Sequence, residues 1–138
     1  LNKDFGVSPE DQIAVTITSM DEVISLSKQL WNFCRKKGLD QRHTYLTSLA
    51  AEEMAGNILA HGFSDGKRHN LVVRVISKNG EMVLTLRDDC RPFDPKERFQ
   101  YLDSDDPAAN IGLRMIMRIA REVSYSSAMK MNNLIIRI

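Results

Sequence analysis

Two stretches rich in Val and Leu, joined by an Asn-Gly pair, constrain the fold of this chain more than any other feature. The stretches are NLVVRVIS (residues 70–77) and EMVLTLRD (residues 81–88), and Lys78-Asn79-Gly80 separates them. Asn-Gly between two β-patterned segments favours a tight hairpin turn, because both residues tolerate a positive φ. The sequence therefore predicts an antiparallel pair of strands, to which the other elements must be added.

Hydrophobic spacing predicts three helices and three further strands in the rest of the chain. In chain order these are a strand over 12–18, helices over 19–37, 40–62 and 110–122, and strands over 123–127 and 134–138. Ser19 and Glu22 have the spacing of a capping box for the first helix, and Asp40 can cap the second. This order predicts an α+β two-layer sandwich, in which three helices cover one face of a mixed, mostly antiparallel sheet.

Length and composition indicate a single soluble domain over residues 1–138. The chain has 43% hydrophobic and 27% charged residues, and its net charge of +1 gives no electrostatic footprint for nucleic acid or an anionic membrane. Its apolar runs are too short for membrane insertion. Two cysteines make no disulfide framework, which favours the reducing cytoplasm. The sequence begins at Leu1 without Met, as a domain cut from a longer chain would.

The second predicted helix carries a polar stripe within its apolar arc. Glu53, Asn57 and His61 follow one another at four-residue spacing, so each is rotated only about 40° from the last. A solvated helix face is one interpretation, but apolar neighbours flank Glu53 and Asn57, and an unpartnered carboxylate there is costly. The stripe therefore indicates a site that uses a carboxylate and an amide, whereas His61 beside Gly62 favours a structural role at the helix end.

Two later segments carry further candidate site residues. LRDDCRPFDP (residues 86–95) places Asp88 at the end of a strand, where layered folds often present functional side chains, although an Asp there can also simply open a turn. NIGLRMI (residues 110–116) places Gly112 at a helix start, where backbone N–H groups can bind phosphate. Residues 90–109 contain three prolines and little periodicity, which is typical of a functional or mobile loop.

In this order the three segments resemble the nucleotide-binding motifs of the GHKL superfamily, which unites gyrase-type ATPases, histidine kinases and anti-sigma-factor kinases on the Bergerat fold. EEMAGNILAHG resembles the N box, DDCRPFDP the G1 box and NIGL the G2 box. The short chain, the PFDP segment and the His-Gly after the N box look most like the anti-sigma-factor serine/threonine kinase regulators. The resemblance covers residues 12–138 and implies a Bergerat-type, GHKL ATPase-like sandwich.

The resemblance implies a role for each matching residue. Asp88 would accept a hydrogen bond from the adenine amino group of ATP, Asn57 would hold Mg²⁺ through its side-chain oxygen, and Glu53 would be the general base. The backbone around Gly112 would hold the phosphates, and residues 93–109 would form the ATP lid. The implied nucleotide-binding residues are Asp88, Asn57, Cys90, Phe93, Asn110, Ile111, Gly112 and Leu113.

Three positions depart from the glycines of the family. Cys90 and Pro92 stand at the two G1 glycines, and Asn110 stands at the first G2 glycine. A side chain fills space that glycine leaves open, so we expect Cys90 either to point its sulfur into the nucleotide pocket or to shift the turn outward. Asn110 is the mildest change, because Asn tolerates the left-handed region and caps helices.

Two functions from different classes fit these motifs. The first is an ATP-binding serine/threonine protein kinase that phosphorylates an anti-sigma-factor antagonist domain and regulates a sigma factor by binding it. The second is a catalytically weak or inactive nucleotide-binding module that acts by protein–protein interaction. The presence of Glu53 favours the kinase, and the altered glycines favour the module. Dimers are common in the family, which leaves a homodimer as an open alternative.

Two other activities of the superfamily fit less well. A gyrase-type ATPase is disfavoured because the chain lacks the transducer domain that those enzymes append. A histidine kinase is disfavoured because no dimerisation helix with a phospho-acceptor histidine precedes the domain in this sequence.

Overall fold

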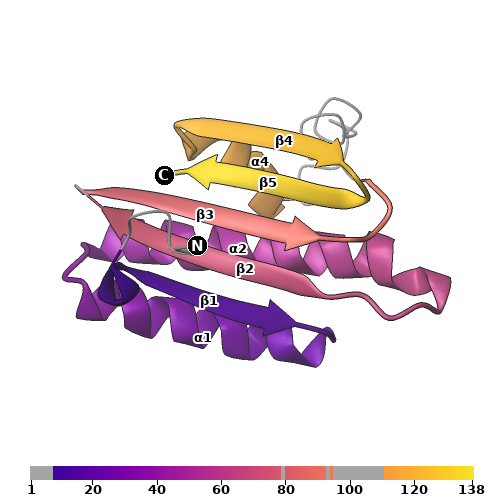
Figure 1. The fold of residues 1–138 in the computed structure, drawn as a ribbon. Coiled ribbons are helices and arrows are strands. Elements are labelled where there is room, and N and C mark those ends of the chain that lie inside the picture. The colour runs from indigo at the N-terminus through magenta and orange to yellow at the C-terminus, as the bar shows by residue number, and fades with distance from the viewer. Residues whose placement is uncertain (1–7, 79, 93, 95–110) are drawn as a thin grey trace.

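The computed structural model of the protein describes residues 8–78, 80–92, 94 and 111–138. Figure 1 shows a single sheet with the helices on one of its faces. The elements are η1 (Pro9–Asp11), β1 (Gln12–Ile17), α1 (Asp21–Lys36), α2 (Gln41–Gly62), η2 (Phe63–Asp65), β2 (Leu71–Lys78), β3 (Glu81–Asp88), α4 (Ile111–Ile119), β4 (Glu122–Ala128) and β5 (Met131–Arg137). The predicted α+β sandwich is confirmed. Asn79 of the predicted hairpin turn lies outside the described residues.

The five described strands run in the order β1-β2-β3-β5-β4, and each neighbouring pair is antiparallel. The predicted hairpin is the β2–β3 pair, and Gly80 in its turn has a φ of +77°. The register aligns Leu71, Asp88 and Asn132 across the ends of β2, β3 and β5. One edge of the sheet therefore brings together chain segments that lie far apart in the sequence.

The core lies between the sheet and the helices, and two polar residues continue its apolar rows. On β3 the buried side chains are Met82, Leu84, Leu86 and Asp88, and on β5 they are Asn132, Leu134 and Ile136. Because alternate side chains of a strand share one face, Asp88 and Asn132 face the helical layer. Among the described residues, no helix has the length and apolarity needed to span a bilayer.

The helix ends confirm one predicted cap and correct the other. Asp40 caps α2, since its Oδ1 accepts a hydrogen bond from the backbone N–H of His43 at 2.7 Å. The capping box predicted for α1 is wrong, because no side chain caps that helix. Glu22 instead folds back to accept hydrogen bonds from the backbone N–H of Thr18 at 3.0 Å and from its hydroxyl at 2.6 Å. The side chain of Glu22 therefore binds Thr18, which is one residue before the expected cap, Ser19.

The turn after β3 packs directly on the end of α2. A β-carbon placed on Gly62 would overlap the Cβ of Cys90 and lie 2.7 Å from its Sγ. Both residues are buried, and Cys90 is 6% exposed. The sulfur therefore points toward the helix end, which is a third outcome beside the two expected from the sequence.

We predict that Gly62→Ala destabilises the fold. The φ of Gly62 is −104°, which alanine adopts readily, so the overlap with Cys90 is the only penalty, about 1–3 kcal/mol of unfolding free energy. Gly56→Ala in the same helix is the matched control, because a β-carbon there meets nothing within 4 Å and gains about 1 kcal/mol of helix propensity. Urea unfolding measures both. Equal stability of Gly62→Ala and the wild type would contradict the packing described here.

Candidate functional site

The buried carboxylate of Asp88 is the anchor of the candidate site. Asp88 is 4% exposed, and its Oδ1 accepts hydrogen bonds from the backbone N–H of Cys90 and from Nδ2 of Asn132, both at 2.9 Å. Nδ2 of Asn132 also donates to the backbone carbonyl of Cys90 at 2.7 Å. The Cys90 thiol also lies within hydrogen-bonding reach of the Asp88 carboxylate. These contacts fix the carboxylate in place at the end of β3.

Asn132 belongs to this network although the sequence analysis did not single it out. It is 2% exposed and lies opposite Asp88 in the register of β3 and β5. The signal that could have found it is the alternation of MNNLIIR, in which Asn132 occupies the same face as Leu134 and Ile136. A buried amide in such a row needs partners, and a buried carboxylate is a suitable one.

The polar stripe of α2 lines a groove beside the start of α1. Glu53 and Asn57 are both half-buried. The groove has a volume of about 380 Å³, and it is lined by Met20, Asp21, Val23, Ile24, Glu52, Glu53, Gly56 and Asn57. Its polar lining consists of carboxylate and amide side chains, whose oxygens are the ligands that Mg²⁺ prefers. The structure thus brings Glu53 and Asn57 to one surface, as the helical spacing predicts.

The first turn of α4 lies on the side chain of Glu53. A β-carbon placed on Gly112 would overlap Cγ and Cδ of Glu53 and lie 2.6 Å from its Oε1. Gly112 is buried, so glycine at this position permits the close contact. Leu113 is 1% exposed and belongs to the core, which leaves its backbone as the part that could meet a ligand. The predicted N-box glutamate and G2-box glycine therefore touch.

Two other segments of the chain contact α2 at different points along its axis. Gly112 meets the helix at Glu53, and Cys90 meets it at Gly62. These two positions lie about 13 Å apart at the helical rise of about 1.5 Å per residue, and Asn57 lies between them. An elongated ligand with one end near Asp88 and the other near Gly112 would pass Asn57 on its way.

The remaining predicted residues are placed as follows. Burial and the nearby carboxylate of Asp88 raise the pKa of the Cys90 thiol to about 12, so the thiol is protonated. Both backbone polar groups of Cys90 are used in the Asp88 network. His61 is exposed in the last turn of α2. Phe93 and Asn110, with lid residues 95–109, lie outside the described residues, and of Ile111 only its place as the first residue of α4 is described.

One sequence family and two solved structures are similar to this chain. Residues 17–138 match the sequence family of the histidine kinase-like ATPase domain. A chain of the SiaB–SiaC complex from Pseudomonas aeruginosa has a similar structure, with a TM-score of 0.68 and 15% identity over 91% of this chain and 88% of that one. At that identity the likeness shows the fold alone.

A second solved structure is also similar. The histidine kinase domain of the blue-light-activated histidine kinase from Erythrobacter litoralis EL346 gives a TM-score of 0.54 and 16% identity, over 98% of this chain and 71% of that one. A search of curated proteins found no sequence match. The two structures share with this chain the arrangement of sheet and helices.

We predict that Asn132→Ala destabilises the fold by about 1–3 kcal/mol, because it removes a donor from the buried Asp88 carboxylate and from the Cys90 carbonyl. Asn133→Ala is the matched control, since Asn133 is half-buried on the opposite face of β5. Its effect should stay within about 0.5 kcal/mol. Chemical denaturation of both variants checks this, and equal losses would mean that the Asp88 network contributes nothing specific.

Proposed function

Because this chain belongs to the histidine kinase-like ATPase (GHKL) family, we propose that it is an ATP-dependent serine/threonine protein kinase of the anti-sigma-factor type. Its substrate is a small domain that antagonises the anti-sigma factor. The kinase also regulates a sigma factor by binding that sigma factor. The proposal combines nucleotide binding, which the ATPase family supports, with chemistry at the polar stripe of α2. The nucleotide and the protein partner meet near Glu53.

The observation that carries the proposal is the fixed carboxylate of Asp88. The backbone N–H of Cys90 and Nδ2 of Asn132 both donate to Oδ1, which sets the orientation of the second oxygen. A carboxylate held in this way is a preorganised acceptor for a ligand that donates a hydrogen bond. The exocyclic amine of adenine is a donor of the required kind, and it would pair with Oδ2 while the Cys90 turn and Asn132 keep the carboxylate fixed.

The phosphates of the nucleotide would lie toward the other end of α2. The backbone N–H groups near Gly112 at the start of α4 suit phosphate oxygens, because they are unpaired within the helix. Asn57 would hold Mg²⁺, which offsets phosphate charge when bound. Phe93, Asn110, Ile111 and Leu113 would contribute to the phosphate loop and the lid through their backbones or side chains.

Glu53 would act on the protein substrate. Its carboxylate accepts the proton of a serine or threonine hydroxyl as that oxygen forms a bond to the transferred phosphoryl group and the bond to ADP breaks. General-base catalysis of this kind contributes about 10²-fold or more to the rate. The groove in front of Glu53 and Asn57 is open to solvent and therefore accessible to a protein side chain.

The partner proposal rests on a likeness of fold. A chain of the SiaB–SiaC complex is similar to this one over most of its length, so the same sandwich occurs in a two-protein assembly. We propose that this chain likewise binds a partner protein, and that the partner is the antagonist domain. A homodimer is a separate proposal, which the mass of the purified chain in solution tests.

One observation favours the alternative function, a nucleotide-binding regulatory module without catalysis. The carboxyl end of Glu53 packs against Gly112, since a β-carbon added to that glycine would overlap Cγ and Cδ of the glutamate. A base held against α4 cannot reach a substrate hydroxyl unless its side chain rotates. In the module, Glu53 serves to position α4, and ATP binding alone changes the surface that the partner contacts.

A two-step experiment separates these functions. Calorimetry with ATP, with and without Mg²⁺, tests nucleotide binding first. The protein is then used to capture partners from extract of the source cell, and the captured complex is incubated with ATP and Mg²⁺ before phosphosite mapping. Serine or threonine phosphorylation of a captured protein supports the kinase. Nucleotide binding without transfer supports the module, and no nucleotide binding contradicts both.

We predict that Asp88→Asn weakens ATP binding by about 2 kcal/mol or more, because an amide either presents a donor to the adenine amine or disrupts the Asn132 contact. Asp40→Asn is the control, since Asp40 caps the far end of α2 and Asn caps helices equally well. Calorimetry measures both affinities. Unchanged affinity in Asp88→Asn would remove Asp88 from the site.

We predict that Glu53→Gln keeps ATP affinity but lowers phosphoryl transfer by about 10²-fold or more, because it removes the proton acceptor and keeps the side-chain size. Glu10→Gln is the control, because Glu10 is exposed in η1 and does not line the groove beside Glu53. Phosphate incorporation into the captured partner is the measurement. A Glu53→Gln variant that transfers phosphate at the wild-type rate would exclude Glu53 as the base.

A further inference from the structure

A compact group of metal-ligating side chains lies beside the turn that follows β3. His69, Asp89 and Cys90 each offer one ligand atom, and these three atoms lie within 4.8 Å of one another. His69 comes from the segment between η2 and β2, whereas the other two follow β3. The side chain of His69 is only 7% exposed and Cys90 is 6% exposed, so two of the three ligand groups are held by packing.

A fourth residue orients the histidine. Nε2 of His69 lies 2.8 Å and 2.9 Å from the two carboxylate oxygens of Asp65, whose Oδ1 also accepts the backbone N–H of Lys67 at 3.0 Å. Nδ1 of His69 lies 3.0 Å from Oδ1 of Asp89. The ring of Phe63 packs at 5.4 Å from that of His69, between centroids. A proton on Nε2 is therefore held by Asp65, and Nδ1 faces Asp89.

We propose that Nδ1 of His69, the carboxylate of Asp89 and Sγ of Cys90 form a Zn²⁺ site, in which Asp65 orients His69. A metal-bound histidine commonly donates its other N–H to a carboxylate, which is the relation of His69 to Asp65. Nitrogen, sulfur and oxygen ligands suit Zn²⁺, whereas Mg²⁺ and Ca²⁺ prefer oxygen alone. The site is separate from the Mg²⁺ position proposed at Asn57.

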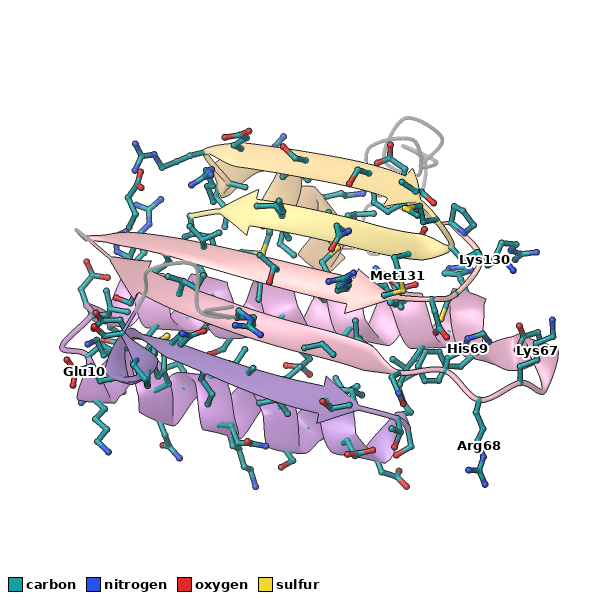
Figure 2. All side chains as sticks on the ribbon, in the orientation of Figure 1. Glu10, Lys67, Arg68, His69, Lys130 and Met131 are labelled. Atoms are coloured by element: carbon teal, nitrogen blue, oxygen red, sulfur yellow. The ribbon has the colours of Figure 1, made fainter. Side chains whose placement is uncertain are left out.

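The adjoining pocket leaves room for a fourth ligand. It has a volume of about 430 Å³, and Cys90, His69 and Asp89 line it. Four exposed cations also line it, namely Lys67, Arg68, Arg91 and Lys130. Figure 2 shows Lys67, His69 and Lys130 gathered at this end of the molecule. The carboxylates of Asp65 and Asp89 offset these cations, and an anion or water suits the fourth position.

The same geometry has a metal-free interpretation, which the test must exclude. The hydrogen bond with Asp65, with a further one from Asp89, raises the pKa of His69, so an imidazolium can bridge the two carboxylates without a metal. Coordination of Zn²⁺ replaces the S–H bond of Cys90 with a Zn–S bond and releases that proton. A proton on Nδ1 of His69 is released in the same step.

Metal titration of the full chain tests the site. After treatment with a chelator, Zn²⁺ added alone should bind at one ion per chain by calorimetry. Co²⁺ added in its place should give visible bands of a tetrahedral site and a near-ultraviolet thiolate-to-cobalt band. The absence of stoichiometric Zn²⁺ binding, or cobalt bound without the thiolate band, would overturn the proposal and leave the imidazolium bridge.

Variants assign the ligands, and two of them change exposed carboxylates. Asp89 and Asp65 have 45% and 44% exposed side chains, so their Asn variants should fold. Asp65→Asn should weaken Zn²⁺ binding about 10- to 100-fold, and Asp89→Asn at least as much. Cys90→Ala should lose the thiolate band, while Cys34→Ala, which removes the other buried thiol, should keep it.

A second histidine–carboxylate pair supplies the matched control. His43 and Asp40 lie 2.8 Å apart at the start of α2. His43→Ala should leave Zn²⁺ affinity within twofold of the wild type. If His43→Ala and Asp89→Asn weaken binding equally, or if neither changes it, the ion is held elsewhere and the proposed site is excluded. None of these measurements uses a nucleotide, so their outcome is independent of the kinase proposal.

Discussion

A carboxylate at the end of a buried strand row has to find hydrogen-bond donors, and the way Asp88 finds them fixes the surrounding structure. One donor is the backbone of Cys90, which sets the turn after β3, and the other is Asn132, which ties that turn to β5. Neither donor is charged. This turn also places Cys90 against Gly62 and Asp89 beside His69. The proposed adenine recognition and the proposed zinc site thus depend on one network.

Close approach to α2 is the second constraint. Side chains normally keep neighbouring elements well apart, but two glycines let Glu53 and Cys90 occupy the space of a missing β-carbon. The contacts fall at separate turns of the helix, and the half-buried Asn57 lies between them. The spacing along the helix therefore defines the length of any ligand that uses both ends. A rigid helix is well suited to this, since its rise per residue is constant.

The sequence predicted the sheet and helices well because their signals are local. Alternation and Asn-Gly locate β2 and β3, and Asp40 locates the start of α2. The β4–β5 turn carried no such signal, since Met129 and Lys130 adopt positive φ values of 53° and 65° without Gly or Asn. The role of Asn132 depends on a register that joins residues distant in sequence. The His69 cluster depends on two loops, whose paths no periodicity specifies.

Cys90 stands at the position that resembles the first G1 glycine, and the glycine that permits the close contact is instead Gly62 of α2. A turn can lie against a helix this closely only if one of the two facing positions lacks a β-carbon, and here that position is Gly62 on the helix. The side chain of Cys90 consequently fills space between turn and helix, while its N–H still reaches Oδ1 of Asp88. The altered glycine therefore does not by itself argue against the proposed adenine site. What separates a kinase from a regulatory module is instead whether Glu53 can leave Gly112, which is a question about one side-chain rotation.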